Sequence, residues 1–125
     1  MTNSFIFKHH PKFPKEKRKM IAKCPSLKED FETFKNALCT DIIYNNFDVP
    51  TNNNKYFQIS GLSKNVTLPV FIVKKFRCQD INKGSDSGFR LTFVYDKKER
   101  LIYFVEFYHK NKKKIEDKNR INNLF

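Results

Sequence analysis

The sequence has 125 residues, of which 39% are apolar and 14 are Phe, and a length of this order is typical of one domain. This aromatic content excludes a disordered chain, because disordered chains are poor in aromatic residues, and we treat 1–125 as a single domain. The net charge of +12 predicts an anionic partner, with nucleic acid favoured over an acidic protein or an anionic membrane surface.

The first half of the chain predicts two helices after a short N-terminal segment. Residues 1–10 indicate a strand or arm, and Pro14 suits the first turn of a helix over 14–23. A second, amphipathic helix is predicted over 26–40, with Ser26 and Glu29 at the spacing of a capping box. Its apolar stripe consists of Leu27, Phe31, Phe34 and Leu38. The short link between the two helices predicts an antiparallel hairpin.

The second half predicts an antiparallel sheet. An Asn-rich loop over 45–55 carries no periodic pattern. Segments rich in β-branched and aromatic residues follow and predict about four strands, at 56–59, 69–77, 88–96 and 101–108. The last two strands are apolar at nearly every position, which is typical of central strands covered on both faces. A short helix is expected within 111–125, so the order of elements predicts an α+β fold.

Cysteine usage and the N-terminal sequence indicate a reducing, cytoplasmic setting. Cys24, Cys39 and Cys78 are odd in number and widely spaced, which argues against a disulfide framework and a zinc module. His9-His10 lacks the further ligands and the spacing of a metal site, so we expect no metal and no other cofactor. The first residues lack the apolar core of a signal peptide, and no apolar run is long enough to span a membrane.

Charged residues interrupt the apolar strands and form the candidate site. Basic residues stand at Lys74, Lys75 and Arg77, and Arg90 lies in the next strand. Glu106 lies inside the last strand. A charge in a buried strand is costly unless it is paired or faces solvent, so these positions suggest a shallow cationic face. The alternatives are solubilisation of a sheet edge and a structural cross-strand pair between Arg90 and Glu106.

His109 and Lys110 end the last strand and suggest acid–base chemistry on RNA. A histidine exchanges protons near neutrality, and the 2′-hydroxyl of RNA supplies its own nucleophile. A metal-independent ribonuclease needs a base, an acid and cations around the phosphorane. His109 fits the first two roles, and Arg90 with Lys110 fits the third. The alternative is a histidine that merely lies on the surface at a strand end.

The sequence resembles the RelE/ParE superfamily of toxins from bacterial toxin–antitoxin modules. Three short motifs carry the resemblance, Gly88-Phe89-Arg90, Tyr108-His109-Lys110 and Arg120-Ile121, together with the helical segment 14–40 and the basic strand before Cys78. The resemblance implies a fold in which an N-terminal helical hairpin packs on a twisted antiparallel sheet, as in microbial ribonucleases, with a basic concave face. Some members end in a catalytic Tyr, whereas this chain has Leu124-Phe125 there.

The resemblance also implies a function. A RelE-like member is an mRNA endonuclease that works on the ribosome without metal and is blocked by a cognate antitoxin protein. In that case the catalytic residues are Arg90, His109 and Lys110, with Glu106 beside them. The RNA-binding residues are Lys74, Lys75, Arg77, Lys112, Lys113 and Lys114. A ParE-like toxin that binds gyrase without cutting RNA, and a basic RNA-binding module without catalysis, remain the alternatives.

Overall fold

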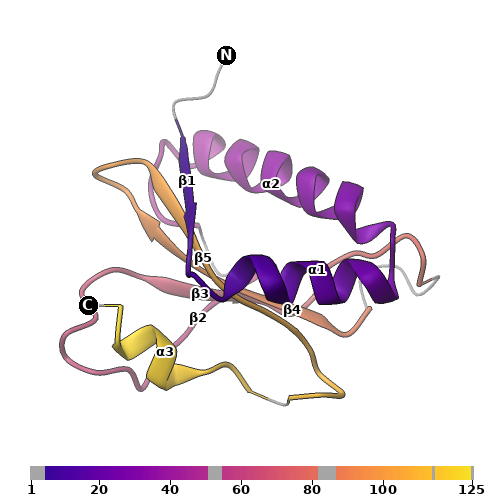
Figure 1. Cartoon of the computed structure of the whole chain (residues 1–125). Coiled ribbons are helices and arrows are strands. Elements are labelled where there is room, and N and C mark those ends of the chain that lie inside the picture. The colour runs from indigo at the N-terminus through magenta and orange to yellow at the C-terminus, as the bar shows by residue number, and fades with distance from the viewer. Residues whose placement is uncertain (1–4, 51–54, 82–86, 114, 125) are drawn as a thin grey trace.

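The computed structural model describes residues 5–50, 55–81, 87–113 and 115–124, and shows the expected α+β fold (Figure 1). No helix in these ranges is long and apolar enough to cross a membrane. The elements are β1 (Ile6–His9), α1 (Phe13–Lys23), α2 (Leu27–Tyr44), β2 (Tyr56–Gln58), β3 (Val70–Val73), β4 (Phe89–Asp96), β5 (Leu101–His109) and α3 (Lys118–Asn122).

The strands form one mixed sheet in the order β1-β5-β4-β3-β2. The four strands β2 to β5 are antiparallel to their neighbours, but β1 runs parallel to β5 along its outer edge. The predicted sheet of about four antiparallel strands is therefore corrected to five strands of mixed direction. The backbone N–H of Ile6 donates to the Arg100 carbonyl at 3.0 Å, and that of His10 donates to the Phe104 carbonyl at 2.8 Å. These bonds occupy backbone groups that an edge strand would otherwise leave unpaired.

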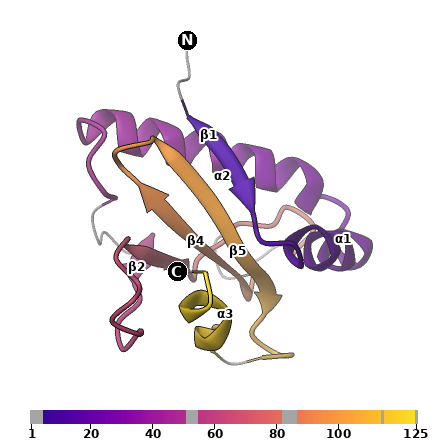
Figure 2. The same cartoon turned by 60° about the vertical axis from the view of Figure 1, so that its left-hand side comes forward.

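Helices α1 and α2 lie on the same face of the sheet, but the predicted antiparallel hairpin is not confirmed. In Figure 2, α1 is seen nearly end-on while α2 lies across the view, so the two helices cross. The predicted capping box is also absent: the Ser26 hydroxyl donates to the Asp30 carboxylate at 2.8 Å and accepts from the Asp80 backbone N–H at 2.9 Å, but it caps no N–H of its own helix. The helix continues beyond the predicted end, to Tyr44.

Strands β4 and β5 are central and are covered on both faces, as their apolar sequences predict. We call the face that packs on α1 and α2 the helix face, and the opposite one the α3 face. The core on the helix face is rich in phenylalanine and includes Phe13, Phe31, Phe93, Phe104 and Phe107. The core on the α3 face is smaller, with Val94, Val105 and Tyr108 beneath Ile121 of α3. Both faces of the sheet are thus closed to water over its centre.

A β-bulge decides which face of the sheet each residue of β5 occupies. Thr92 lies opposite Glu106, whereas the next residue, Phe93, lies opposite Phe104, so Val105 is the extra residue. Beyond the bulge, Tyr108 faces the α3 side and His109 the helix side, because side chains alternate along a strand. The bulge therefore sets the orientation of most of the predicted catalytic residues.

Candidate functional site

The strand register separates Arg90 from His109. Arg90 lies opposite Tyr108, which belongs to the core of the α3 face. Phe89 lies opposite His109, and their rings pack edge to face at 5.0 Å on the helix face. The structure therefore does not bring the predicted phosphate-binding arginine and the predicted acid–base histidine to one phosphate.

Arg90 lines a hollow on the α3 face. We call it the α3-face hollow; its volume is about 230 Å³, and its charged or hydroxyl-bearing lining includes Lys74, Arg90, Tyr108, Glu116 and Lys118. One guanidinium nitrogen of Arg90 donates to the Lys74 carbonyl at 2.6 Å, which fixes the direction of the side chain. The Lys74 ammonium lies 5.5 Å from the centre of the Phe57 ring, within range of a cation–π contact. Three basic side chains from β4, α3 and the residue after β3 thus meet around one depression.

The hydroxyl of Tyr108 is buried without a hydrogen-bond partner among the described residues. The residue is 6% exposed, and its buried hydroxyl has no hydrogen-bond partner among the described residues. Burial raises the pKa of Tyr108, and the nearby carboxylates of Glu116 and Glu106 raise it further, so the hydroxyl stays protonated. A buried hydroxyl without a partner is costly, and Tyr108 is one of the residues that line the α3-face hollow. The hydroxyl is therefore a protonated donor without a partner among the described residues.

Glu106 has a structural position. It is 3% exposed; one carboxylate oxygen is ion-paired with the Lys113 ammonium, and the other accepts from the Asp117 backbone N–H at 2.9 Å. Its register partner is Thr92, so the alternative of a pair with Arg90 in direct cross-strand register is not formed. Lys113 is likewise engaged by this pair, which leaves its ammonium less available to RNA than the sequence suggests.

Both ring nitrogens of His109 are engaged. The Asn111 backbone N–H donates to Nδ1 at 3.1 Å, so Nε2 carries the proton and donates to the Ser87 carbonyl at 3.1 Å. Gly88 lies against the same ring: a Cβ atom at this position would meet Nε2 at 2.6 Å. The backbone of Gly88 has φ of +88°, a conformation that glycine tolerates best. These contacts make His109 part of the packing at the end of β5.

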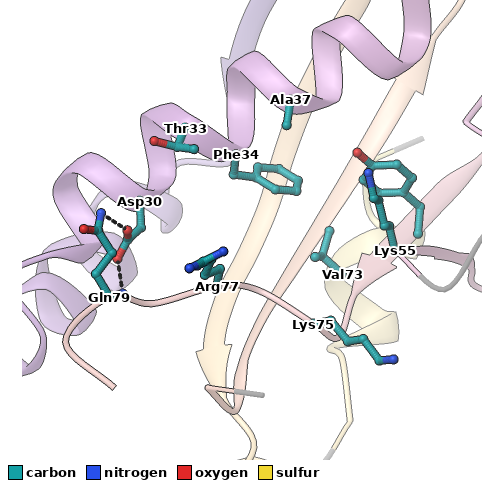
Figure 3. A pocket seen from close by; sticks show the side chains of 10 residues that line it. Asp30, Thr33, Phe34, Ala37, Lys55, Val73, Lys75, Arg77 and Gln79 are labelled. Atoms are coloured by element: carbon teal, nitrogen blue, oxygen red, sulfur yellow. Dashed lines mark hydrogen bonds between the residues drawn. The ribbon is translucent and has the colours of Figure 1, made fainter. Parts of the chain in front are cut away.

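The remaining predicted basic residues are divided between sites. Lys110 and Lys112 are exposed just beyond the end of β5, and Lys114 lies outside the described residues. Lys75 and Arg77 line a larger cavity under α2, with a volume of about 780 Å³ (Figure 3). Lys74, between Val73 and Lys75, lines the hollow on the other face. The basic residues of segment 74–77 therefore line two separate cavities and do not form the single cationic face that the sequence predicts.

Glu116 and Lys118 were not predicted as site residues. They line the hollow with Arg90 because the chain after β5 folds back over the α3 face, and Arg120 of this returning segment reaches Glu16 of α1 in a bidentate ion pair. Arg120 also donates to the Val105 carbonyl at 2.9 Å, which ties α3 to β5 at the bulge. No local sequence pattern around Glu116 or Lys118 indicates that the chain returns to the sheet.

Comparison with known proteins found no match to the chain among protein-family models, curated proteins or solved structures.

Proposed function

We propose that the chain is a RelE-like toxin of a toxin–antitoxin module and that it binds mRNA through the α3-face hollow. One observation carries the proposal: Lys74, Arg90 and Lys118 line one depression, and Tyr108, whose buried hydroxyl has no partner among the described residues, lines it with them. The finer fold that goes with this proposal is the microbial-RNase-like one, with two helices on one face of the sheet and a basic site on the other. The proposed partners are mRNA on the ribosome and a cognate antitoxin.

The hollow suits a phosphodiester better than an unspecific anion. Arg90 uses one nitrogen on the Lys74 carbonyl and keeps further N–H groups for phosphate oxygens. The ammonium groups of Lys74 and Lys118 add positive charge, and the hydroxyl of Tyr108 donates a hydrogen bond to a phosphate oxygen that loses its bound water on binding. Binding then releases counterions, so affinity falls as salt is raised.

We further propose that cleavage, in this hollow, uses Glu116 as the base in place of His109. Glu116 is the carboxylate that lines the hollow beside Arg90. It takes the proton of the RNA 2′-hydroxyl, whose oxygen attacks the adjacent phosphorus. The bond from phosphorus to the 5′-oxygen breaks, that oxygen receives a proton from Tyr108, and Arg90 stabilises the phosphorane. The products are a 2′,3′-cyclic phosphate and a 5′-hydroxyl; no metal or cofactor takes part in this scheme.

The test is induced expression in a bacterial host with 5′-end mapping of mRNA. The proposal expects cuts in the wild type that are lost in Arg90→Ala and Glu116→Gln and retained in Lys98→Ala, whose lysine lies in the β4–β5 turn. Cuts that persist in Arg90→Ala would overturn the site. Arrested growth with intact mRNA would overturn the nuclease proposal in favour of a ParE-like, gyrase-type target.

A second candidate, RNA binding without cleavage, is favoured by the state of His109. Both nitrogens of this ring are bonded, so the histidine that the sequence offered for proton transfer is not free to perform it. Binding of single-stranded RNA that depends on Arg90, without any cleavage under conditions of translation, would support this candidate.

A further inference from the structure

A large cavity lies under α2, between that helix and the segment that leaves β3, and we call it the α2 cavity (Figure 3). Its volume of about 780 Å³ falls in the range of small-molecule sites. It borders the helix-face core, whereas the α3-face hollow lies across the sheet. Nothing in the proposed function uses this cavity.

The floor of the α2 cavity is apolar and aromatic. Phe34 projects from α2 into the cavity, and its ring packs against those of Phe76 at 5.3 Å and Tyr56 at 6.4 Å. Ala37 and Val73 complete the apolar part of the lining. Because these rings are fixed by their neighbours, Phe34 presents a rigid surface against which a planar group can pack at little entropic cost.

Positive charge gathers at the edge of this floor. Lys75 and Arg77 are exposed, and neither has an ion-pair partner among the described residues. The Arg77 side chain points into the cavity, whereas the Lys75 side chain, which also lines it, points away from Arg77 (Figure 3). Lys55 lines the other end and lies 3.5 Å from Asp41. An anionic group is therefore best placed at Arg77, with Lys75 adding positive charge to the same cavity.

The carboxylate in the lining, Asp30, does not neutralise these cations. It accepts from the Ser26 hydroxyl at 2.8 Å, from the Gln79 backbone N–H at 3.0 Å and from the Gln79 amide at 2.7 Å (Figure 3). Burial works to raise its pKa, but these hydrogen bonds together outweigh burial and lower it. Asp30 is thus an ionised structural group whose oxygens already have partners, and Arg77 remains available.

From this combination we infer that the α2 cavity binds a nucleoside phosphate, with the base against Phe34 and the phosphate at Arg77. A planar aromatic group and an anion joined within one small ligand match the apolar floor and the cationic edge together. The ligand has two sources, a free mononucleotide or an unpaired nucleotide at the end of an RNA chain. The inference is independent of the proposed function, because the two sites share no lining residue.

Calorimetric titration of the full chain with AMP, and separately with an unstructured RNA hexamer, tests the inference. Arg77→Ala is expected to weaken binding by about tenfold or more, since it removes a charged donor to the phosphate. Ala37→Phe fills the floor from the exposed side of α2 and is expected to block binding without a change in charge. Lys98→Ala is the matched control for both ligands, Arg90→Ala is a control for AMP alone, and circular dichroism confirms that each variant is folded.

Each outcome decides between the sources or overturns the inference. AMP binding that is weakened by Arg77→Ala and blocked by Ala37→Phe assigns the site to a free nucleotide. Binding of the hexamer alone, with the same dependence, assigns it to an RNA end. Equal affinity for AMP and adenosine, or no effect of either cavity variant, overturns the inference. Loss of RNA binding in Arg90→Ala with AMP binding intact leaves the inference standing and concerns the α3-face hollow alone.

Discussion

Removal of the Arg120 side chain is expected to destabilise the fold and to dismantle the α3-face hollow. Arg120 donates to both carboxylate oxygens of Glu16, at 3.0 and 2.7 Å, and to the Val105 carbonyl at 2.9 Å. Its side chain is 9% exposed and that of Glu16 is 23% exposed. The hydrogen bonds to Glu16 raise the pKa of Arg120, and the pair joins the first helix to the last across β5.

The expected loss follows from the burial of this pair. Removal of one partner from a buried ion pair costs about 3 kcal/mol, because the other charge stays buried without compensation. For a chain of 125 residues the entropy of unfolding is roughly 0.26 kcal/mol per degree, so Tm falls by about 10 °C. Arg120→Lys keeps the charge but loses the bidentate geometry, and an intermediate loss is expected.

Urea unfolding of Arg120→Ala, Glu16→Ala and the double variant measures the coupling between the two side chains. A coupling of about 1 kcal/mol or more is expected, since the two residues share hydrogen bonds. Arg18→Ala, at an exposed arginine of α1, is the control and is expected to stay within about 0.5 kcal/mol of the wild type. Additive losses in the double variant, or a Tm of Arg120→Ala within about 2 °C of the wild type, would refute this reasoning.

Three further outcomes are expected. Gly88→Ala should destabilise the fold by about 1–3 kcal/mol in thermal melts, because the new Cβ meets the His109 ring and because alanine is strained at positive φ. Adding His109→Ala to this variant should remove the clash with the ring but leave the backbone strain. Tyr108→Phe should leave stability unchanged or higher and weaken RNA binding, and a clear loss of stability would contradict the unpartnered hydroxyl. The lowered pKa of Asp30 contributes stability that is present above the unfolded pKa of 3.8 and is lost as pH falls through the lower folded value; Asp30→Asn should therefore flatten acid unfolding below pH 4.

The helices and strands were largely predictable because their patterns are local. The stripe from Leu27 to Leu38 lies on the core-facing side of α2, and β2, β4 and β5 end within a residue of their predicted limits. The strand predicted over 69–77 is shorter, because β3 ends at Val73 and the basic residues from Lys74 onward lie outside it. The parallel pairing of β1 with β5 was not predictable, because all four side chains of β1 are exposed and so short a segment does not indicate which strand it pairs with. The crossing of α1 and α2 likewise depends on how each helix packs on the sheet.

The candidate site was predicted only in part, because register and chain return are not local properties. Arg90 and Lys74 were predicted to belong to one cationic surface, and both line the α3-face hollow. The bulge at Thr92 and Phe93 sets the facing of Glu106 and His109, and no pattern in β4 or β5 reveals it. Lys75 and Arg77 turn to the other face within a single basic run, which composition alone cannot resolve.

The central claim, that the α3-face hollow is where RNA is bound and cut, is tested most directly by 5′-end mapping of mRNA in cells that express Arg90→Ala or His109→Ala beside the wild type. The account expects codon-phased cuts in the wild type and in His109→Ala, provided that the latter is folded, and none in Arg90→Ala. Cuts that survive in Arg90→Ala but vanish in a folded His109→Ala would contradict it and move the chemistry to the end of β5.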